Sequence, residues 1–138
     1  MIFVDTSFFV ALLDPRDGNH ARAVKALSVL REQRLGDALL TTNNVVLETI
    51  TVARYEVGHA LAVRAGQLLY GEKLARLHRT NADEEAAAFE YLKKYRDKEY
   101  SAVDCLSFVV MEKRGITEAL AFDSDFSHRF VVRPGPAR

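Results

Sequence analysis

The first fifteen residues, MIFVDTSFFVALLDP, constrain the fold more than any other stretch of the chain. Residues 2–4 form a short apolar run that is typical of a buried strand, and the apolar block after Ser7 is typical of a packed helix. Asp5 therefore lies where a strand ends and a helix begins. Because ligands of open α/β sheets bind at the carboxyl ends of the strands, Asp5 is a candidate functional residue.

The rest of the chain alternates short strand patterns with helical patterns. Besides 2–4, strands are expected at residues 38–42, 73–78, 119–122 and 130–132. Helices are expected from residue 8, at 19–34, from 45 to an interruption at Gly58, at 59–69, from about 82 and at 101–114. Their N-cap candidates are Asn19, Asn43 or Asn44, Thr80 or Asn81, and Ser101. This alternation favours the α/β class, with a parallel sheet covered by helices on both faces.

The composition is that of one globular domain. The chain has 138 residues, of which 49% are hydrophobic and 28% charged, and its formal net charge is zero, so no basic excess indicates a nucleic-acid partner. A single cysteine excludes an internal disulfide and fits a reducing compartment. No apolar run has the roughly 18 residues of a membrane helix, and no signal-peptide pattern precedes the first strand. We therefore expect a soluble, cytoplasmic protein.

Acidic residues stand where a parallel sheet would bring them to one edge. Asp5 and Asp123 each follow a short strand, and Asp125 comes two residues later. Glu48 and Asp104 lie in the first turns of helices. Because the carboxyl ends of parallel strands and the starts of the following helices share an edge, we expect these acids to converge.

Each acid also has a purely local interpretation. Asp5 is a candidate N-cap for the first helix, and Ser101 with Asp104 has the pattern of a capping box. Glu48 is a possible solvated acid, and Asp123 and Asp125 are ordinary turn residues. The coincidence of their positions, rather than any single acid, favours a common site.

A cluster of carboxylates needs a counter-charge. Two like charges about 4 Å apart repel by roughly 4 kcal/mol at an effective dielectric constant near 20. Oxygen ligands suit Mg²⁺ or Mn²⁺, and a carboxylate-held pair of such ions is suited to phosphodiester hydrolysis by an activated water. Thr6 or Ser7 either orients a ligand there or is an ordinary helix-start hydroxyl. The remaining candidate ligands lack zinc-like spacing and are expected at the surface or in the core: His20, His59, His78, His128 and Cys105.

Four motifs in this order resemble the PIN-domain ribonucleases of the VapC type, which are toxins of toxin–antitoxin pairs. They are Val4-Asp5-Thr6-Ser7, Glu48, Ser101-Ala102-Val103-Asp104-Cys105 and Ala121-Phe122-Asp123-Ser124-Asp125-Phe126. The resemblance covers essentially the whole chain. It implies a three-layer α/β/α fold with four or five parallel strands in the order 3-2-1-4-5. We expect a single PIN domain over residues 1–132 and a tail at 133–138.

The resemblance also implies a site and a reaction. The implied catalytic acids are Asp5, Glu48, Asp104 and Asp123. The implied ligands of one or two Mg²⁺ or Mn²⁺ ions are Asp5, Asp104, Asp123 and, matching a position that is acidic in only some members, Asp125. Thr6 and Ser7 would support the site. The implied reaction is endonucleolytic cleavage of RNA by metal-activated water, leaving a 5′-phosphate.

The implied partners are an RNA substrate, a second copy of the chain in a homodimer, and a small VapB-like antitoxin. Independently of the resemblance, residues 45–70 carry more apolar side chains than one buried stripe requires, which favours a protein–protein surface there. The RNA target is open among tRNA, rRNA and mRNA. The basic residues that would hold phosphates are also open, with these candidates: Arg16, Arg54, Lys113, Arg114, Arg129 and Arg133.

Three competing interpretations fit the sequence less well. A haloacid-dehalogenase-type phosphatase needs a second aspartate two residues after the first, and this chain has Ser7 there. A phospho-accepting receiver domain needs a lysine after a late strand, and no lysine follows Phe122. The third is a catalytically silent PIN-like scaffold that binds RNA or protein, and the complete set of acids argues against it.

Overall fold

A five-stranded parallel sheet forms the centre of the protein, whose computed structural model describes residues 1–134. The strands are β1 (Ile2–Val4), β2 (Leu39–Thr42), β3 (Arg76–His78), β4 (Glu118–Ala121) and β5 (Val131–Pro134). Their order is β3-β2-β1-β4-β5, and every neighbouring pair is parallel. The α/β class and the strand order that the resemblance implied are therefore confirmed.

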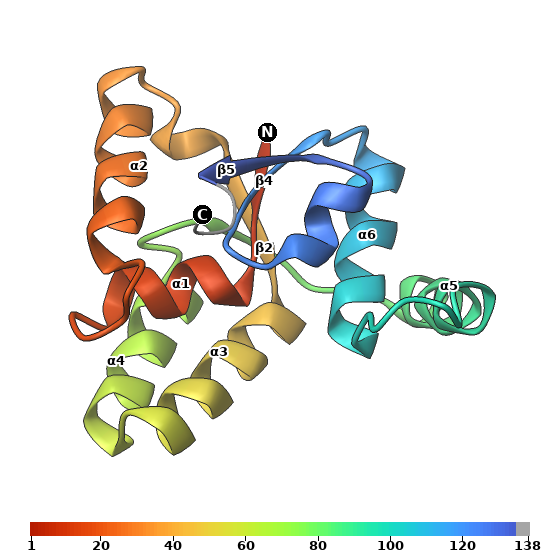
Figure 1. Ribbon diagram of the computed structural model, residues 1–138, viewed down its shortest axis with the longest axis horizontal. Coiled ribbons are helices and arrows are strands. Elements are labelled where there is room, and N and C mark those ends of the chain that lie inside the picture. Colours follow the sequence, from red (N-terminus) through yellow and green to blue (C-terminus); the bar gives the residue numbers. More distant parts are fainter. Residues whose placement is uncertain (135–138) are drawn as a thin grey trace.

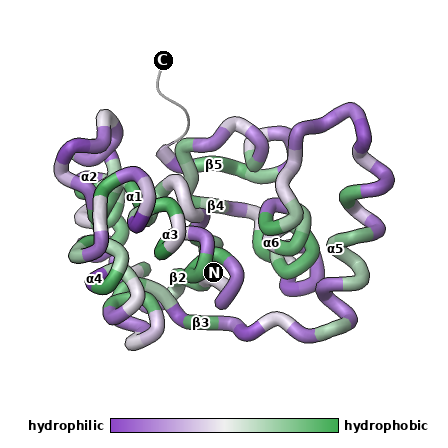
Figure 2. The backbone as a smooth tube through the Cα atoms, turned by 90° about the horizontal axis from the view of Figure 1, so that it is seen from below, coloured by the Kyte–Doolittle hydropathy of each residue, from purple (hydrophilic) through white to green (hydrophobic). Residues whose placement is uncertain are grey.

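Six helices cover the two faces of this sheet. They are α1 (Thr6–Leu13), α2 (His20–Glu32), α3 (Asn43–Glu56), α4 (His59–Tyr70), α5 (Ala82–Lys94) and α6 (Ala102–Arg114). The first four lie on one side and α5 and α6 on the other, as Figures 1 and 2 show from two directions. Two short 3₁₀ helices, η1 (Gly36–Ala38) and η2 (Ser124–His128), precede β2 and β5.

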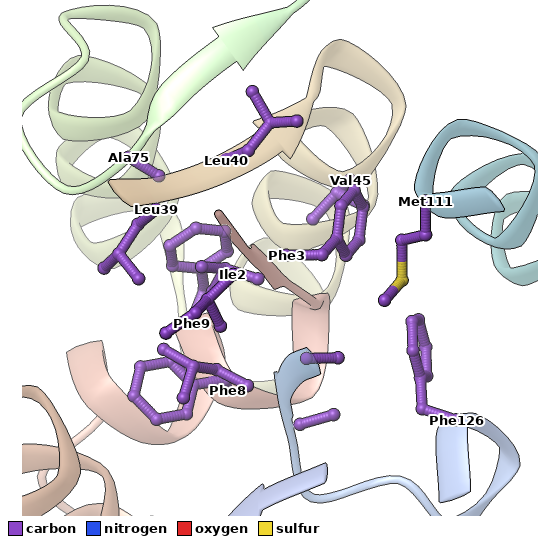
Figure 3. Packing of buried hydrophobic residues seen from close by; sticks show 14 of the residues in the cluster. Ile2, Phe3, Phe8, Phe9, Leu39, Leu40, Val45, Ala75, Met111 and Phe126 are labelled. Carbon is purple, nitrogen blue, oxygen red and sulfur yellow. The ribbon is translucent and has the colours of Figure 1, made fainter. Parts of the chain in front are cut away.

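The central strands are buried on both faces, which explains their continuous apolar sequences. Phe3 and Val4 of β1 have no exposed surface. Figure 3 shows Phe8 and Phe9 on one side of β1, with Met111 on the other. Because both sides of β1 are packed in this way, the strand places the residue that follows it, Asp5, at a rigid position.

The expected N-cap of α3, Asn43 or Asn44, is wrong. Thr42, the last residue of β2, caps α3 by accepting a hydrogen bond from the backbone N–H of Val45 (3.2 Å). Its extended backbone lets a strand residue serve as the cap, so neither candidate asparagine is needed there. Asn43 instead accepts from the backbone N–H of Thr80 (2.9 Å), and Asn44 donates to the Thr80 hydroxyl (2.6 Å). These asparagines therefore tie the start of α3 to the segment before α5.

Most other boundaries lie close to the expected ones, but the strand expected at 73–78 begins only at Arg76, because residues 71–75 form the turn that follows α4. Asn81 and Ser101 cap α5 and α6 through capping boxes, whereas Asn19 makes no side-chain cap of α2. The last strand extends to Pro134, two residues beyond the expected boundary. The remainder of the expected tail, 135–138, lies outside the described residues. Among residues 1–134, no helix combines the length and the apolar character that crossing a membrane requires.

An aromatic cluster fixes η2 against the sheet and α6. Phe126 of η2 is fully buried, with its ring centroid 6.3 Å from that of Phe3 and 4.9 Å from that of Phe108. Tyr100 and Phe130 also pack on Phe108, at 5.0 and 5.7 Å. Because buried side chains in a dense core cannot move independently, this cluster holds the segment on which Asp125 lies.

Replacing Phe126 by alanine is expected to lower the free energy of unfolding by about 3–5 kcal/mol, because a large buried ring is lost and a cavity remains. The matched substitution Phe89→Ala removes a ring that is 59% exposed, and it should change stability by about 0.5 kcal/mol or less. Urea unfolding of both variants measures the difference. Equal shifts of the two midpoints would contradict this account of the cluster.

Candidate metal centre and active site

Asp5 is held at the carboxyl edge of the sheet by hydrogen bonds that join β1, α1 and β4. Its backbone N–H donates to the carbonyl of Leu120 (3.0 Å). Its carboxylate accepts from the Ser7 hydroxyl (2.9 Å) and the Ser7 N–H (3.3 Å). The Ser7 hydroxyl in turn accepts from the backbone N–H of Phe122 (2.9 Å). Ser7 therefore couples the position of Asp5 to the end of β4, where Asp123 follows.

Asp104 combines a local role with a place in the acidic cluster. Its Oδ2 accepts from the backbone N–H of Ser101 (3.0 Å), and its own N–H donates to the Ser101 hydroxyl (3.0 Å). The capping box that the sequence suggested is thus present. It holds the carboxylate at the start of α6, facing Asp123 and Asp125. One ligand oxygen from each of these three aspartates lies within 4.8 Å of the others.

The acids surround a cavity of about 270 Å³ at the edge of the sheet. Six of the residues singled out in the sequence line it: Asp5, Thr6, Ser7, Glu48, Asp104 and Asp123. Asp125 belongs to the group of three aspartates but not to this lining. Its backbone N–H donates to Asp123 Oδ1 (2.9 Å). The structure thus brings together all the acids that the sequence placed at this edge.

Six further residues line the cavity and were not among the predicted site residues: Val10, Asp17, Asn19, Val52, Glu56 and Phe122. Val52 and Glu56 follow Glu48 at intervals of four, so helical periodicity alone puts them on the same face of α3. That signal was available in the sequence. Asp17 and Asn19 lie in the turn before α2, and no local pattern predicts that this turn reaches the site.

Burial and mutual repulsion shift the carboxyl groups toward their neutral forms. Burial, followed by the charge of Asp104, raises the pKa of Asp5 to about 7. Burial also raises the pKa of Asp104 to about 6. The hydrogen bond from Ser101 lowers this pKa, and the charges of Asp123 and Glu48 raise it further. The pKa of Asp125 is raised as well, by burial and then by Asp123. The cluster therefore has an unsatisfied demand for positive charge.

None of the proposed phosphate-binding cations lines this cavity within the described part of the chain. Arg129 pairs with Glu112 (2.9 Å) and Arg133 with Glu118 (3.0 Å). Arg114 contacts His78 Nδ1 at 3.1 Å. The remaining three candidates, Arg16, Arg54 and Lys113, are also outside the lining. The countercharge that the acids need is thus not supplied by these side chains.

The donor set fits a hard divalent cation. The three clustered aspartates offer carboxylate oxygens only, which suits Mg²⁺ or Mn²⁺ better than softer metals. The buried Thr6 hydroxyl, beside Asp5, has no hydrogen-bond partner among the described residues. Histidine and cysteine are not part of the group, and Cys105 is fully buried in the core as expected.

The raised pKa of Asp5 predicts how the metal-free protein responds to pH. Because the folded state binds this proton more tightly than the unfolded chain, the free energy of unfolding should fall as pH rises from about 4 to about 7. Asp5→Asn should be less sensitive to pH and more stable than wild type at the upper end. The control is Asp37→Asn, which changes an exposed aspartate in η1.

Thermal unfolding in the presence of a chelator measures this pH dependence. If the stability of wild type and of Asp5→Asn depends on pH in the same way, the pKa of Asp5 is not raised as expected.

Comparison with known proteins agrees with this fold. The PIN domain family model matches residues 2–129. The 23S rRNA-specific endonuclease VapC20 of Mycobacterium tuberculosis is 41% identical over 136 residues, covering 99% of each chain.

The solved structures that resemble this chain include two crystal structures. That of M. tuberculosis VapC20, described as a sarcin–ricin loop cleaving toxin, superposes with a TM-score of 0.83 at 39% identity, covering 93% of this chain and 94% of the other. FitAcB from Neisseria gonorrhoeae shares the fold at 18% identity, with a TM-score of 0.65 and 96% coverage of each chain. The match to the family model and the full-length identity to VapC20 show that this chain belongs to the PIN-domain family.

Proposed function

We propose that this chain is a metal-dependent endoribonuclease that acts as the toxin of a toxin–antitoxin pair. The observation that carries the proposal is the group of aspartates from α6 and the end of β4, which come within 4.8 Å of one another beside the buried Asp5. The full-length likeness to VapC20, which is itself named a 23S rRNA-specific endonuclease, supports the same activity.

The proposed roles follow from the geometry of the acids. Asp5, Asp104, Asp123 and Asp125 would hold one or two Mg²⁺ or Mn²⁺ ions. A divalent cation bound there supplies Lewis acidity, which lowers the pKa of water and offsets phosphate charge. Glu48, which lines the cavity from α3, would orient the attacking water. Ser7 keeps the Asp5 carboxylate in position, and the Thr6 hydroxyl supports the site.

We further propose that the substrate is the sarcin–ricin loop of 23S rRNA. The support is the 41% identity to VapC20 and the description of its structure as a toxin that cleaves this loop. A ribosomal substrate places the activity in the cytoplasm.

The proposed protein partners are a small antitoxin and a second copy of the chain. The helical pair α3–α4 exposes several large apolar side chains that suit such contacts: Leu47, Tyr55, Val57, Val63 and Tyr70.

Mn²⁺ or Mg²⁺ should raise the melting temperature of wild type, because a ligand that binds only the folded state stabilises it by about 2.7 kcal/mol at 100 times its Kd. For a domain of this size, that corresponds to roughly 5–10 °C. The shift should be much smaller in Asp5→Asn and Asp104→Asn, and unchanged in Asp37→Asn. Equal shifts in all four proteins would show that the aspartates are not one metal site.

Cleavage should require both the cation and Asp5. Wild type with Mg²⁺ or Mn²⁺ should cut a sarcin–ricin stem-loop at one position and leave a 5′-phosphate, whereas Asp5→Asn should lose at least about 100-fold in rate, the smaller end of what removing one electrostatic group costs at such sites. Asp37→Asn should cut like wild type.

Gel analysis of the stem-loop, of total tRNA and of an unstructured RNA checks the activity and its target together. Binding of RNA without any cutting, in the presence of a metal-induced rise in melting temperature, would favour the non-catalytic scaffold instead.

A further inference from the structure

A second cavity lies between α2 and β5. Its volume is about 440 Å³, which is within the range of small-ligand sites. Its rim carries three cationic side chains, Arg22, Lys25 and Arg133, and its apolar floor includes Val29 and Leu120. Neither the family resemblance nor the proposed chemistry of the acids assigns it a role.

Arg22 lies on the wall between this cavity and the acidic cavity. Its guanidinium donates to Asn19 Oδ1 (3.2 Å) and to the carbonyl of Pro134 (3.2 Å), and it stacks 5.2 Å from the centroid of the Phe122 ring. Asn19 and Phe122 line the acidic cavity, whereas Arg22 and Pro134 line the second cavity. One side chain thus joins the two cavities.

The orientation of this guanidinium is fixed before any ligand arrives. The Phe122 ring on which it stacks is itself stacked on Phe8, at 5.9 Å between centroids and 8° between planes. Arg133, which also lines the cavity, is paired with Glu118 (3.0 Å), so its charge is already offset. A guanidinium held in place as that of Arg22 is binds an anion with little further cost in side-chain entropy.

The charges of the two cavities are complementary in a way that suits RNA. The acids can accept a scissile phosphate only through a cation, and they repel the phosphates on either side of it. A strand that reaches them therefore needs cationic contacts nearby for its flanking phosphates. Within the described residues, the α2–β5 cavity supplies such contacts and is joined to the acidic cavity through Arg22, and its apolar lining suits the face of a base.

We propose that the α2–β5 cavity is a nucleotide subsite for the RNA strand whose scissile phosphate lies at the acids. Arg22 and Lys25 bind a flanking phosphate, and the base packs on the apolar floor around Val29. This inference rests on the proposed endoribonuclease activity and adds a specific place for the substrate outside the acidic cluster.

The test measures binding of the sarcin–ricin stem-loop by fluorescence anisotropy over a range of salt concentrations, in the cleavage-deficient Asp5→Asn protein. Arg22→Gln and Lys25→Gln are made in that background. Arg31→Gln is the matched control, because Arg31 is an exposed cation on the same helix but outside the cavity. Arg22→Lys keeps the positive charge but loses the planar set of N–H donors of the guanidinium.

Arg22→Gln should raise Kd about tenfold, the loss expected for one charged hydrogen-bonded contact. Lys25→Gln should raise it several-fold. Each should reduce the slope of log Kd against log salt by about 0.7–0.9, the value for one lost phosphate contact. Arg22→Lys should retain most of the slope, and Arg31→Gln should match the parent. Unfolding of a variant would not produce this set of changes in the salt slope, and melting curves show whether a variant is folded.

Two results would overturn the subsite while leaving the nuclease intact. One is an unchanged Kd and salt slope for both Arg22→Gln and Lys25→Gln in a parent that binds RNA. The other is that these substitutions leave RNA binding unchanged and weaken only the binding of the antitoxin, which would make the cavity a peptide site. If wild type neither cuts nor binds RNA, the proposed function fails and the subsite fails with it.

Discussion

Mutual repulsion among buried carboxylates is the constraint on which this structure depends. Asp5 and Asp104 are both largely removed from water, and burial and charge raise the pKa of each. Placing them together costs stability in the absence of a cation. The fold opposes this cost with a fully packed central strand, an aromatic cluster behind η2, and hydrogen bonds that hold each carboxylate at a defined position.

The local and the functional interpretations of these acids turn out to be compatible. Asp5 does cap α1, and Asp104 does close a capping box, yet both line the same cavity. A carboxylate has two oxygens and several acceptor positions, so one hydrogen bond to the backbone leaves room for another ligand. The cap also serves the site, because it fixes the rotamer of the side chain. Evidence for a cap is therefore no evidence against a role in chemistry.

Much of the fold and the acidic cluster could be predicted from the sequence because the signals are local. Apolar strands followed by acids, and helix starts with acids in the first turn, define an edge once the strands are parallel. The positions of Asp17, Asn19 and Arg22 could not be predicted, because they depend on how the turn after α1 folds back beside β4 and β5. The caps of α3 were misassigned because a hydroxyl at the end of a strand competes with the asparagines that follow it.

The strand order has a consequence for folding during synthesis on the ribosome. The central strand β1 leaves the ribosome before the other four strands of the sheet, but its neighbour β4, and the aspartates that follow β4, are synthesised only after β2, β3 and α6. Until those residues emerge, Asp5 has neither the backbone partner at Leu120 nor the clustered acids beside it. Domains are completed as synthesis proceeds from the N-terminus. The acidic centre therefore forms only after the segment that carries β4 and its following aspartates has been synthesised.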